Sequence, residues 1–366
     1  MKRTCMKSAS LKPFAIIIVP TRELAVQICA EAKRLVKNLC VTVALTYGQL
    51  DPKETVRDIK GGCDILIGTL GRLLSHIKPD NRGPTPIPIK LENLCYTIVD
   101  EADDFVRPVG NTQFQDLMEV LKKHQKRLYV FSATFTEGTV EFYKRYMTSV
   151  PFEILGRDGT DLINFGWRLV NKENKRMQLL EDLNYTAEVY GKVPKTVVFV
   201  DTKVRCKFVS FFLAVNNLPS VLIFGDCVQT IREHQMSRFV SGECQIMVCT
   251  NLAARGLNMC NIKYVINYDY PSNGNGADIF THRVGRTGRG GNQGVALTYF
   301  EEGRDNASAR EIVELMHRIG QHPPDSIYRY AGIERPQPQI ENINEDEEVY
   351  EVMYRGYDTS DSNSDA

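Results

Sequence analysis

The sequence predicts an α/β protein with two parallel sheets, and three observations indicate this fold class. Short apolar runs alternate with helical patterns through both halves of the 366-residue chain, as in sheets covered by helices. Several runs end abruptly in polar residues, which is typical of the carboxyl edge of a parallel sheet. Residues 156–163, with two glycines and no apolar periodicity, predict a linker between the halves.

The apolar runs of the first half predict its strands, and the patterns between them predict its helices. Strands are expected at 14–19, 41–46, 64–67, 94–99, 128–131 and 152–155, with helices from 21, after 71, from about 113 to 124 and up to about 147. We therefore expect a first domain over residues 1–155.

Two helices of this half begin beside a strand end and a basic residue. Thr21 is a candidate N-cap with Arg22 next to it, and Thr69 precedes Arg72 in the same way. The free N–H groups at a helix start suit a phosphate. The alternative is a capped surface helix without a ligand.

Two adjacent carboxylates, Asp100 and Glu101, follow the apolar run at 94–99. One such acid can hold a hard cation through its water shell while the other polarises an attacking water. The alternative is a solvated turn that leads into a helix.

The second half repeats the alternation. Strands are expected at 196–200, 221–224, 246–249, 264–267 and 295–299, with helices at about 203–213 and 229–239. This spacing predicts a parallel sheet covered on both faces, within a second domain over 164–335.

Composition excludes several classes of protein. The chain is 43% hydrophobic and 25% charged, and it has no run of eighteen apolar residues, so no membrane association is expected. Residues 1–7 are basic but lack the apolar core of a signal peptide. The ten cysteines form no C-x-x-C pair, which favours reduced thiols over disulfides or zinc. We expect a cytoplasmic protein, with the nucleus or RNP granules as further locations.

The zero net charge hides an asymmetry. Glu341–Ala366 contains nine acidic residues and one basic residue, which leaves 44 basic and 36 acidic residues in the rest of the chain. We expect a basic body suited to a phosphate backbone, and a disordered acidic tail over 336–366.

Six motifs occur in one order: Pro20–Ala25, Gly71-Arg72, Asp100–Asp103, Ser132–Thr134, Ala253–Gly256 and His282–Arg289. Through them the chain, from about Phe14 to Phe300, resembles the DEAD-box RNA helicases of superfamily 2. The acidic end and Phe199–Lys203 are similar to those of Vasa-type helicases. The resemblance implies two RecA-like domains, ATP and Mg²⁺ as cofactors, and single-stranded RNA or a short duplex as partner.

The resemblance also implies a role for each matching residue. For catalysis it implies Asp100 (which positions Mg²⁺ through water), Glu101 (which orients and activates the water), His282, Arg286 and Arg289. For nucleotide binding it implies Asp103, Gly256 and Asn258. For RNA binding it implies Thr21, Arg22, Gly48, Thr69, Gly71, Arg72, Thr202 and Thr250, and for coupling between the domains Ser132, Thr134 and Arg255.

The sequence departs from the family pattern at several positions. Gln49 replaces a glycine, Leu70 a proline, and Asn251 and Asn258 replace acids. An asparagine at 258 can still accept a hydrogen bond from a ribose hydroxyl, but without charge assistance.

No G-x-x-x-x-G-K-[ST] loop occurs in the 366 residues, although this family holds ATP with one. We expect the first domain to lack its N-terminal strand, loop and helix, because of a truncated reading frame or a fragment. An interior strand would then be missing, so two neighbouring strands would lose partners and an apolar face would be exposed. Two functions stay open: an ATP-dependent RNA helicase, or an ATP-independent RNA-binding or regulatory protein.

Overall fold

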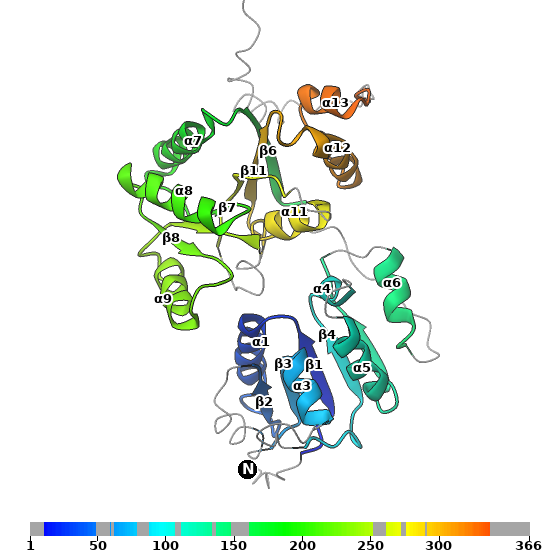
Figure 1. Ribbon diagram of the computed structural model, residues 1–366. Helices are drawn as coiled ribbons and strands as arrows, with labels where there is room; N and C mark the ends of the chain where they lie inside the picture. The colour runs from blue at the N-terminus through cyan, green and yellow to red at the C-terminus, as the bar shows by residue number, and fades with distance from the viewer. Residues whose placement is uncertain are drawn as a thin grey trace, which may run out of the picture. The chain divides into compact units, whose positions relative to one another are not determined.

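The computed structural model describes residues 11–48, 59, 62–78, 88–106, 111–133, 137–147, 161–251, 261–271, 276–289 and 291–336. The chain divides into two compact units (Figure 1). The first contains the described residues up to 147, and the second contains nearly all of those from 161 onward. Each unit is a parallel sheet with helices on both faces, so the predicted fold class is confirmed.

The first sheet has five parallel strands in the order β2-β3-β1-β4-β5. They are β1 (Ala15–Val19), β2 (Val43–Thr46), β3 (Ile65–Thr69), β4 (Tyr96–Val99) and β5 (Arg127–Val130). Val19 pairs with Thr69, and Val99 pairs with Ile18 and Val130. This register brings the carboxyl ends of the strands to one edge, where the polar residues that follow them gather.

Helices cover both faces of this sheet: α1 (Arg22–Leu35), α3 (Leu70–Ile77), α4 (Asp103–Val106), α5 (Asn111–Leu121) and α6 (Glu137–Lys144). Successive strand residues point to opposite faces. Val19 packs under α1 with Leu24, while Ile18 belongs to a second core with Phe114 of α5. Burying such a side chain contributes about 1.5–3 kcal/mol.

The described strands of the first sheet form a continuous ladder that ends at β5, so the expected loss of a strand between two neighbours stays a prediction. Exposed apolar side chains occur beside the β5 edge. Tyr96 and Tyr129 are 37% and 42% exposed, with ring centroids 6.2 Å apart, and Phe131 is 56% exposed. The predicted strand at 152–155 lies outside the described residues.

The second sheet has six parallel strands in the order β6-β11-β10-β7-β9-β8. They are β6 (Ile163–Val170), β7 (Thr196–Phe199), β8 (Ser220–Ile223), β9 (Ile246–Cys249), β10 (Tyr264–Asn267) and β11 (Gly294–Glu301). The helices are α7 (Lys175–Tyr190), α8 (Lys203–Val215), α9 (Gln229–Val240), α11 (Gly276–Val284), α12 (Ala309–Arg318) and α13 (Asp325–Ala331). The five expected strands and two expected helices are confirmed, whereas β6, α7 and α11 to α13 were not predicted.

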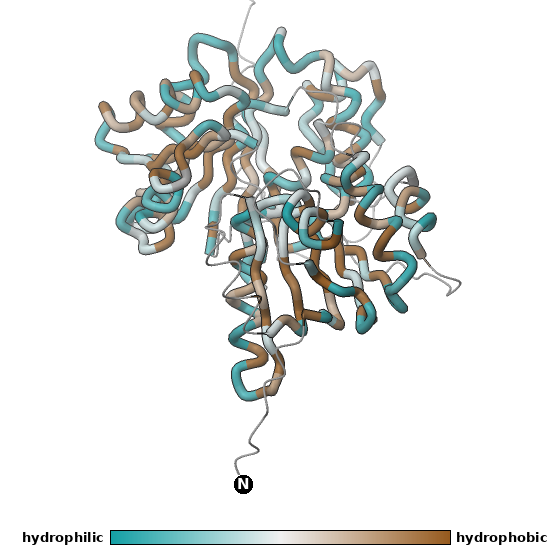
Figure 2. The backbone as a smooth tube through the Cα atoms, turned by 60° about the horizontal axis from the view of Figure 1, so that its bottom comes forward, coloured by the Kyte–Doolittle hydropathy of each residue, from teal (hydrophilic) through white to brown (hydrophobic). Residues whose placement is uncertain are grey.

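Two apolar cores lie on opposite faces of the second sheet. One contains Leu183 of α7 and Val209 of α8, and the other contains Phe280 of α11 and Met316 of α12. In Figure 2 the strands of the sheets are mostly hydrophobic, whereas the helices alternate between hydrophobic and hydrophilic turns. Trp167, the single tryptophan, stacks on Phe280 at 6.2 Å and 10°.

No helix in the described parts of the chain is long and apolar enough to cross a membrane. The eight cysteines within those parts are free thiols, and most of them are buried.

Candidate functional site

The acidic pair lies at the carboxyl end of β4. The amide of Asp100 donates to the Ile18 carbonyl at 3.0 Å, and the Glu101 amide donates to Asp100 Oδ1 at 2.9 Å. Glu101 has a φ of 49°, in the left-handed region that is strained for a glutamate. Burial raises the pKa of Asp100, and the nearby Asp103 adds to the rise, although the Glu101 amide opposes it. The fold therefore holds two carboxyl groups in a fixed, costly geometry at the sheet edge.

Ser132 contacts this acidic motif directly. Its hydroxyl donates to Asp103 Oδ1 at 2.6 Å, and the Ala102 amide donates to the Phe131 carbonyl at 3.0 Å. The buried Tyr143 hydroxyl donates to the Ala102 carbonyl at 2.9 Å. The structure thus brings the end of β5 against the acidic motif, while Thr134 lies outside the described residues.

The predicted phosphate-binding residues of the first unit share the same edge. Thr21 caps α1, and its hydroxyl accepts from the Leu24 amide at 3.4 Å. Gly48 follows β2, and a Cβ there would lie 3.5 Å from the Arg22 guanidinium. Thr69 ends β3 and caps α3, without a hydrogen bond from its side chain. The Thr69 hydroxyl is therefore not engaged in capping.

Arg72 in the first turn of α3 has an unusual environment. Its Nε is buried and has no hydrogen-bond partner within the described residues. An unpaired buried donor costs about 1–3 kcal/mol, and more when it is charged. An anionic acceptor such as a phosphate oxygen would remove this cost. There is free space beside the neighbouring Gly71, since a Cβ at that residue would lie no nearer than 4.0 Å to another atom.

The resemblance implies RNA binding by two threonines of the second unit, and both lie at the carboxyl edge of its sheet. Thr202 follows β7 and caps α8, and its hydroxyl accepts from the Arg205 amide at 3.1 Å. Thr250 follows β9, and its amide donates to the Ile223 carbonyl at 3.2 Å.

The arginine motif of the second unit extends from the carboxyl edge of that sheet, where Arg283 binds Asp201, toward the start of β10. The Thr287 hydroxyl donates to the Ile262 carbonyl at 2.7 Å, just before β10 begins. Arg286 is 6% exposed and donates to the His282 carbonyl at 3.2 Å, while Arg289 donates to the Gly285 carbonyl at 2.5 Å. Arg255, Gly256 and Asn258 lie outside the described residues.

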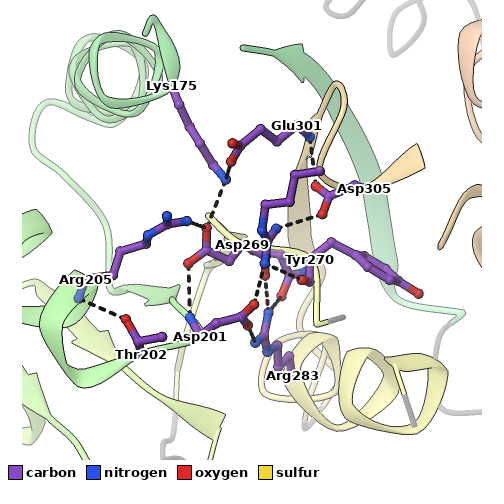
Figure 3. Close-up of polar contacts among 11 residues, drawn as sticks. Lys175, Asp201, Thr202, Arg205, Asp269, Tyr270, Arg283, Glu301 and Asp305 are labelled. Atoms are coloured by element: carbon purple, nitrogen blue, oxygen red, sulfur yellow. Dashed lines mark hydrogen bonds and ion pairs between the residues drawn. The ribbon is translucent and has the colours of Figure 1, made fainter. Parts of the chain in front are cut away.

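A buried ionic network in the second unit was missed by the sequence reasoning (Figure 3). Lys175, only 2% exposed, binds Asp269 at 2.9 Å and Glu301 at 2.7 Å. Arg205 reaches Asp269 from α8 at 2.5 Å. Although burial opposes ionisation, Lys175 and Arg205 hold the pKa of Asp269 below its ordinary value. Asp269 comes two residues after the strand predicted at 264–267, much as Asp100 follows the run at 94–99, so a similar signal could have found it.

The network continues through a fully enclosed arginine. Arg283 donates to Asp201 at 3.1 Å and lies over the Phe199 ring at 5.2 Å. Arg304 also binds Asp201 and pairs with Asp305 at 2.7 Å. These contacts connect β7, α11 and the end of β11, so Arg283, inside the His282–Arg289 motif, stabilises the unit's interior.

Two family models match the chain. The model described as DEAD/DEAH box helicase matches residues 3–142, and that described as Helicase conserved C-terminal domain matches residues 174–291. The ATP-dependent RNA helicase vasa of Drosophila melanogaster is 34% identical over 319 residues, which is 86% of this chain and 46% of that protein. The chain thus spans about half the length of this relative.

Solved structures of similar fold include Dbp5 of S. cerevisiae bound to RNA and ADP BeF3, with a TM-score of 0.68 and 22% identity. This match covers 94% of the present chain and 81% of the Dbp5 chain. Mss116 bound to ssRNA and UDP-BeF has a TM-score of 0.69 and 21% identity, and covers 90% and 69% of the two chains. At these identities the similarity shows the fold.

Proposed function

Because the chain belongs to the DEAD-box helicase family, we propose that it acts as an RNA-dependent ATPase that separates short RNA duplexes or remodels RNA–protein complexes. One observation carries the proposal: the carboxyl edge of the first sheet holds both the acidic pair and the phosphate-binding helix starts. The comparisons do not favour the second candidate, an ATP-independent RNA-binding or regulatory protein.

Helicases of this family use ATP with a divalent metal. No group of three metal-binding side chains occurs among the described residues. Mg²⁺ commonly needs only one or two carboxylates, with water and phosphate oxygens as its other ligands. The acidic edge fits that arrangement, with Asp100 as the residue that would hold the ion through water.

The remaining roles follow from charge and position. When bound, Mg²⁺–ATP supplies the phosphoryl group that is transferred to water. Glu101 would orient the attacking water and accept its proton. Arg286 and Arg289 would stabilise the negative charge that develops, because a guanidinium stays protonated and matches phosphoryl oxygens. Ser132, through Asp103, would couple this edge to the bound RNA.

RNA binding would use the helix starts of both units. Thr21, Arg22 and Arg72 offer phosphate donors in the first unit, and Thr202 and Thr250 offer hydroxyls in the second. Phosphate contacts of this kind fix the position of a strand without reading its sequence. The solved structures of Dbp5 and Mss116 are bound to RNA, which supports RNA as the partner.

The test is RNA-stimulated phosphate release by the 366-residue chain, and by the same chain extended at its amino end with a segment that carries a Gly-Lys-Thr loop. We expect the 366 residues to bind RNA with little turnover, because a γ-phosphate must be held before Glu101 can act. The extended chain should hydrolyse ATP, and Glu101→Gln should reduce its rate about 10²–10⁴-fold.

Two results would overturn the proposal. The first is an extended chain whose phosphate release does not respond to RNA. The second is an equal rate for the extended chain and its Glu101→Gln variant. Unchanged RNA binding together with either result would favour the ATP-independent alternative.

The free thiols of the described cysteines support a reducing compartment as the location. We infer the cytoplasm, with the nucleus or RNP granules as further locations. Fluorescence microscopy of the tagged chain checks this, and secretion would contradict it.

A further inference from the structure

Helix α8 carries apolar side chains on its outward face as well as on its inward face. Cys206, Val209 and Leu213 are buried in the core of the second unit. On the opposite side lie Val204, Phe208, Phe211 and Val215, which are 72%, 48%, 69% and 65% exposed. Their spacing of four, three and four residues aligns them along one face of the helix. We call these four residues the α8 stripe.

A pocket of about 640 Å³ adjoins one end of the stripe. Val204 and Phe208 of the stripe line it, so the apolar surface continues into the pocket. Its other walls come from the starts of α7 and α8 and from the ends of β10 and β11: Lys172, Glu173, Lys175, Arg176, Thr202, Arg205, Tyr268 and Glu301. Four of the lining side chains are cations and two are carboxylates, and Asp269 behind the wall binds Lys175 and Arg205, so the excess positive charge lies at Lys172 and Arg176.

An apolar stripe that ends in a basic pocket favours the binding of a ligand that is both acidic and apolar. Exposed apolar surface of this kind marks an interaction site. An amphipathic segment would lie along the stripe with apolar side chains every three or four residues. Carboxylates of that segment would meet Lys172 and Arg176 at the pocket.

We propose that the segment Glu341–Ala366 of this same chain docks on the α8 stripe and its pocket. The segment carries nine acids, which complement the basic pocket. Within it Val349, Met353 and Tyr357 recur every four residues, and Tyr350 and Tyr354 repeat the spacing one position later. This spacing would allow the segment to present one apolar face to the stripe, with Glu347 and Glu351 next to that face.

The covalent connection makes this docking favourable even if the contact itself is weak. Twelve residues separate Pro336, the last described residue, from Val349, and an extended chain of that length spans about 40 Å. A short tether holds its ligand at an effective concentration of about 1 mM. A contact with a dissociation constant of about 0.1 mM would then be occupied in roughly nine of ten molecules.

Docking would also compete with a polyanion at the same helix start. Thr202 and Arg205 lie at the mouth of α8 beside the pocket. An acidic segment held there would weaken the binding of RNA phosphates through charge repulsion. The docking itself requires no RNA, so its test is independent of the proposed function.

The experiment is hydrogen–deuterium exchange on the full 366-residue chain without RNA or nucleotide. Amides of residues 347–357 should exchange about tenfold more slowly than in the Phe211→Glu variant, which places a carboxylate in the stripe. Met353→Glu should remove the same protection by changing the segment and not the stripe. Ile231→Glu on α9, at a side chain that is 52% exposed, is the matched control and should retain the protection.

Dilution decides which copy of the chain supplies the segment. Protection by the chain's own segment should persist unchanged over a hundredfold dilution, whereas protection that fades would show docking between two copies and overturn the proposal. Exchange at the unprotected rate in the unsubstituted chain would also overturn it, as would protection that survives both Phe211→Glu and Met353→Glu.

Discussion

Lys175→Met is expected to destabilise the second unit strongly, because it removes one buried cation from between two buried carboxylates. Lys175 is 2% exposed, and its partners Asp269 and Glu301 are 0% and 7% exposed. Asp269 would keep Arg205 at 2.5 Å and the Asp201 amide at 3.0 Å. Glu301 would lose its ion-pair partner. Breaking a buried pair from one side costs about 3–5 kcal/mol.

The chain supplies a matched control in Lys203→Met. Lys203 is the first residue of α8 as Lys175 is of α7, and it pairs with Asp226 at 2.8 Å. Both side chains of this pair are more than half exposed, at 61% and 73%. An ion pair this exposed to solvent contributes little to stability. Both substitutions also remove a cation from a helix N-terminus, so this dipole effect cancels in the comparison.

Urea unfolding followed by Trp167 fluorescence measures the difference, because the single tryptophan lies in β6 of the second unit. With a slope of about 2 kcal/mol per molar urea, Lys175→Met should lower the midpoint by about 1.5–2.5 M. Lys203→Met should lower it by less than about 0.5 M. Equal midpoints for the two variants would refute the view that burial makes this network important for stability.

Three further predictions concern other parts of the chain. Arg22→Ala and Arg72→Ala should each reduce the slope of log RNA affinity against log salt by about one, and unchanged slopes in both would remove these residues from the RNA site. Gly68→Ala should unfold the first unit, since a Cβ there would collide with the backbone of β2, whereas Gly71→Ala should not; circular dichroism distinguishes them. Burial raises the pKa of Asp305 to about 6, so the folded chain binds this proton more tightly than the unfolded chain. From pH 7 to pH 5 the unfolding free energy should therefore rise by about 1 kcal/mol more than in Asp305→Asn, as Trp167 fluorescence would show; parallel pH profiles would contradict it.

Much of the fold could be predicted from the sequence because buried strands are short apolar runs. The runs that become β1, β4, β7 and β10 are almost free of polar residues and end sharply. Edge strand β6, Ile163–Val170, was missed because it mixes Asn164, Gly166 and Arg168 with its apolar residues. A strand with one side open does not need a continuous apolar sequence.

The sequence predicted site residues only where they belong to short motifs at the ends of strands. Thr21, Thr69 and Ser132 lie at strand ends or within two residues of them, so their common edge follows from parallel pairing. Contacts such as that of Lys175 with Glu301 join residues 126 positions apart, and no local sequence pattern predicts them. Arg283 was within a recognised motif, yet only its burial shows that it stabilises the interior.

The left-handed backbone at Glu101 has a consequence for how this protein would respond to selection. A non-glycine residue in that conformation costs about 1–2 kcal/mol, and glycine adopts it without this cost. Glu101→Gly would relieve the strain while it deletes the carboxylate assigned to the attacking water. A library screened only for thermal resistance would accordingly enrich a variant that lacks this carboxylate, and screens on this chain should include a functional readout from the first round.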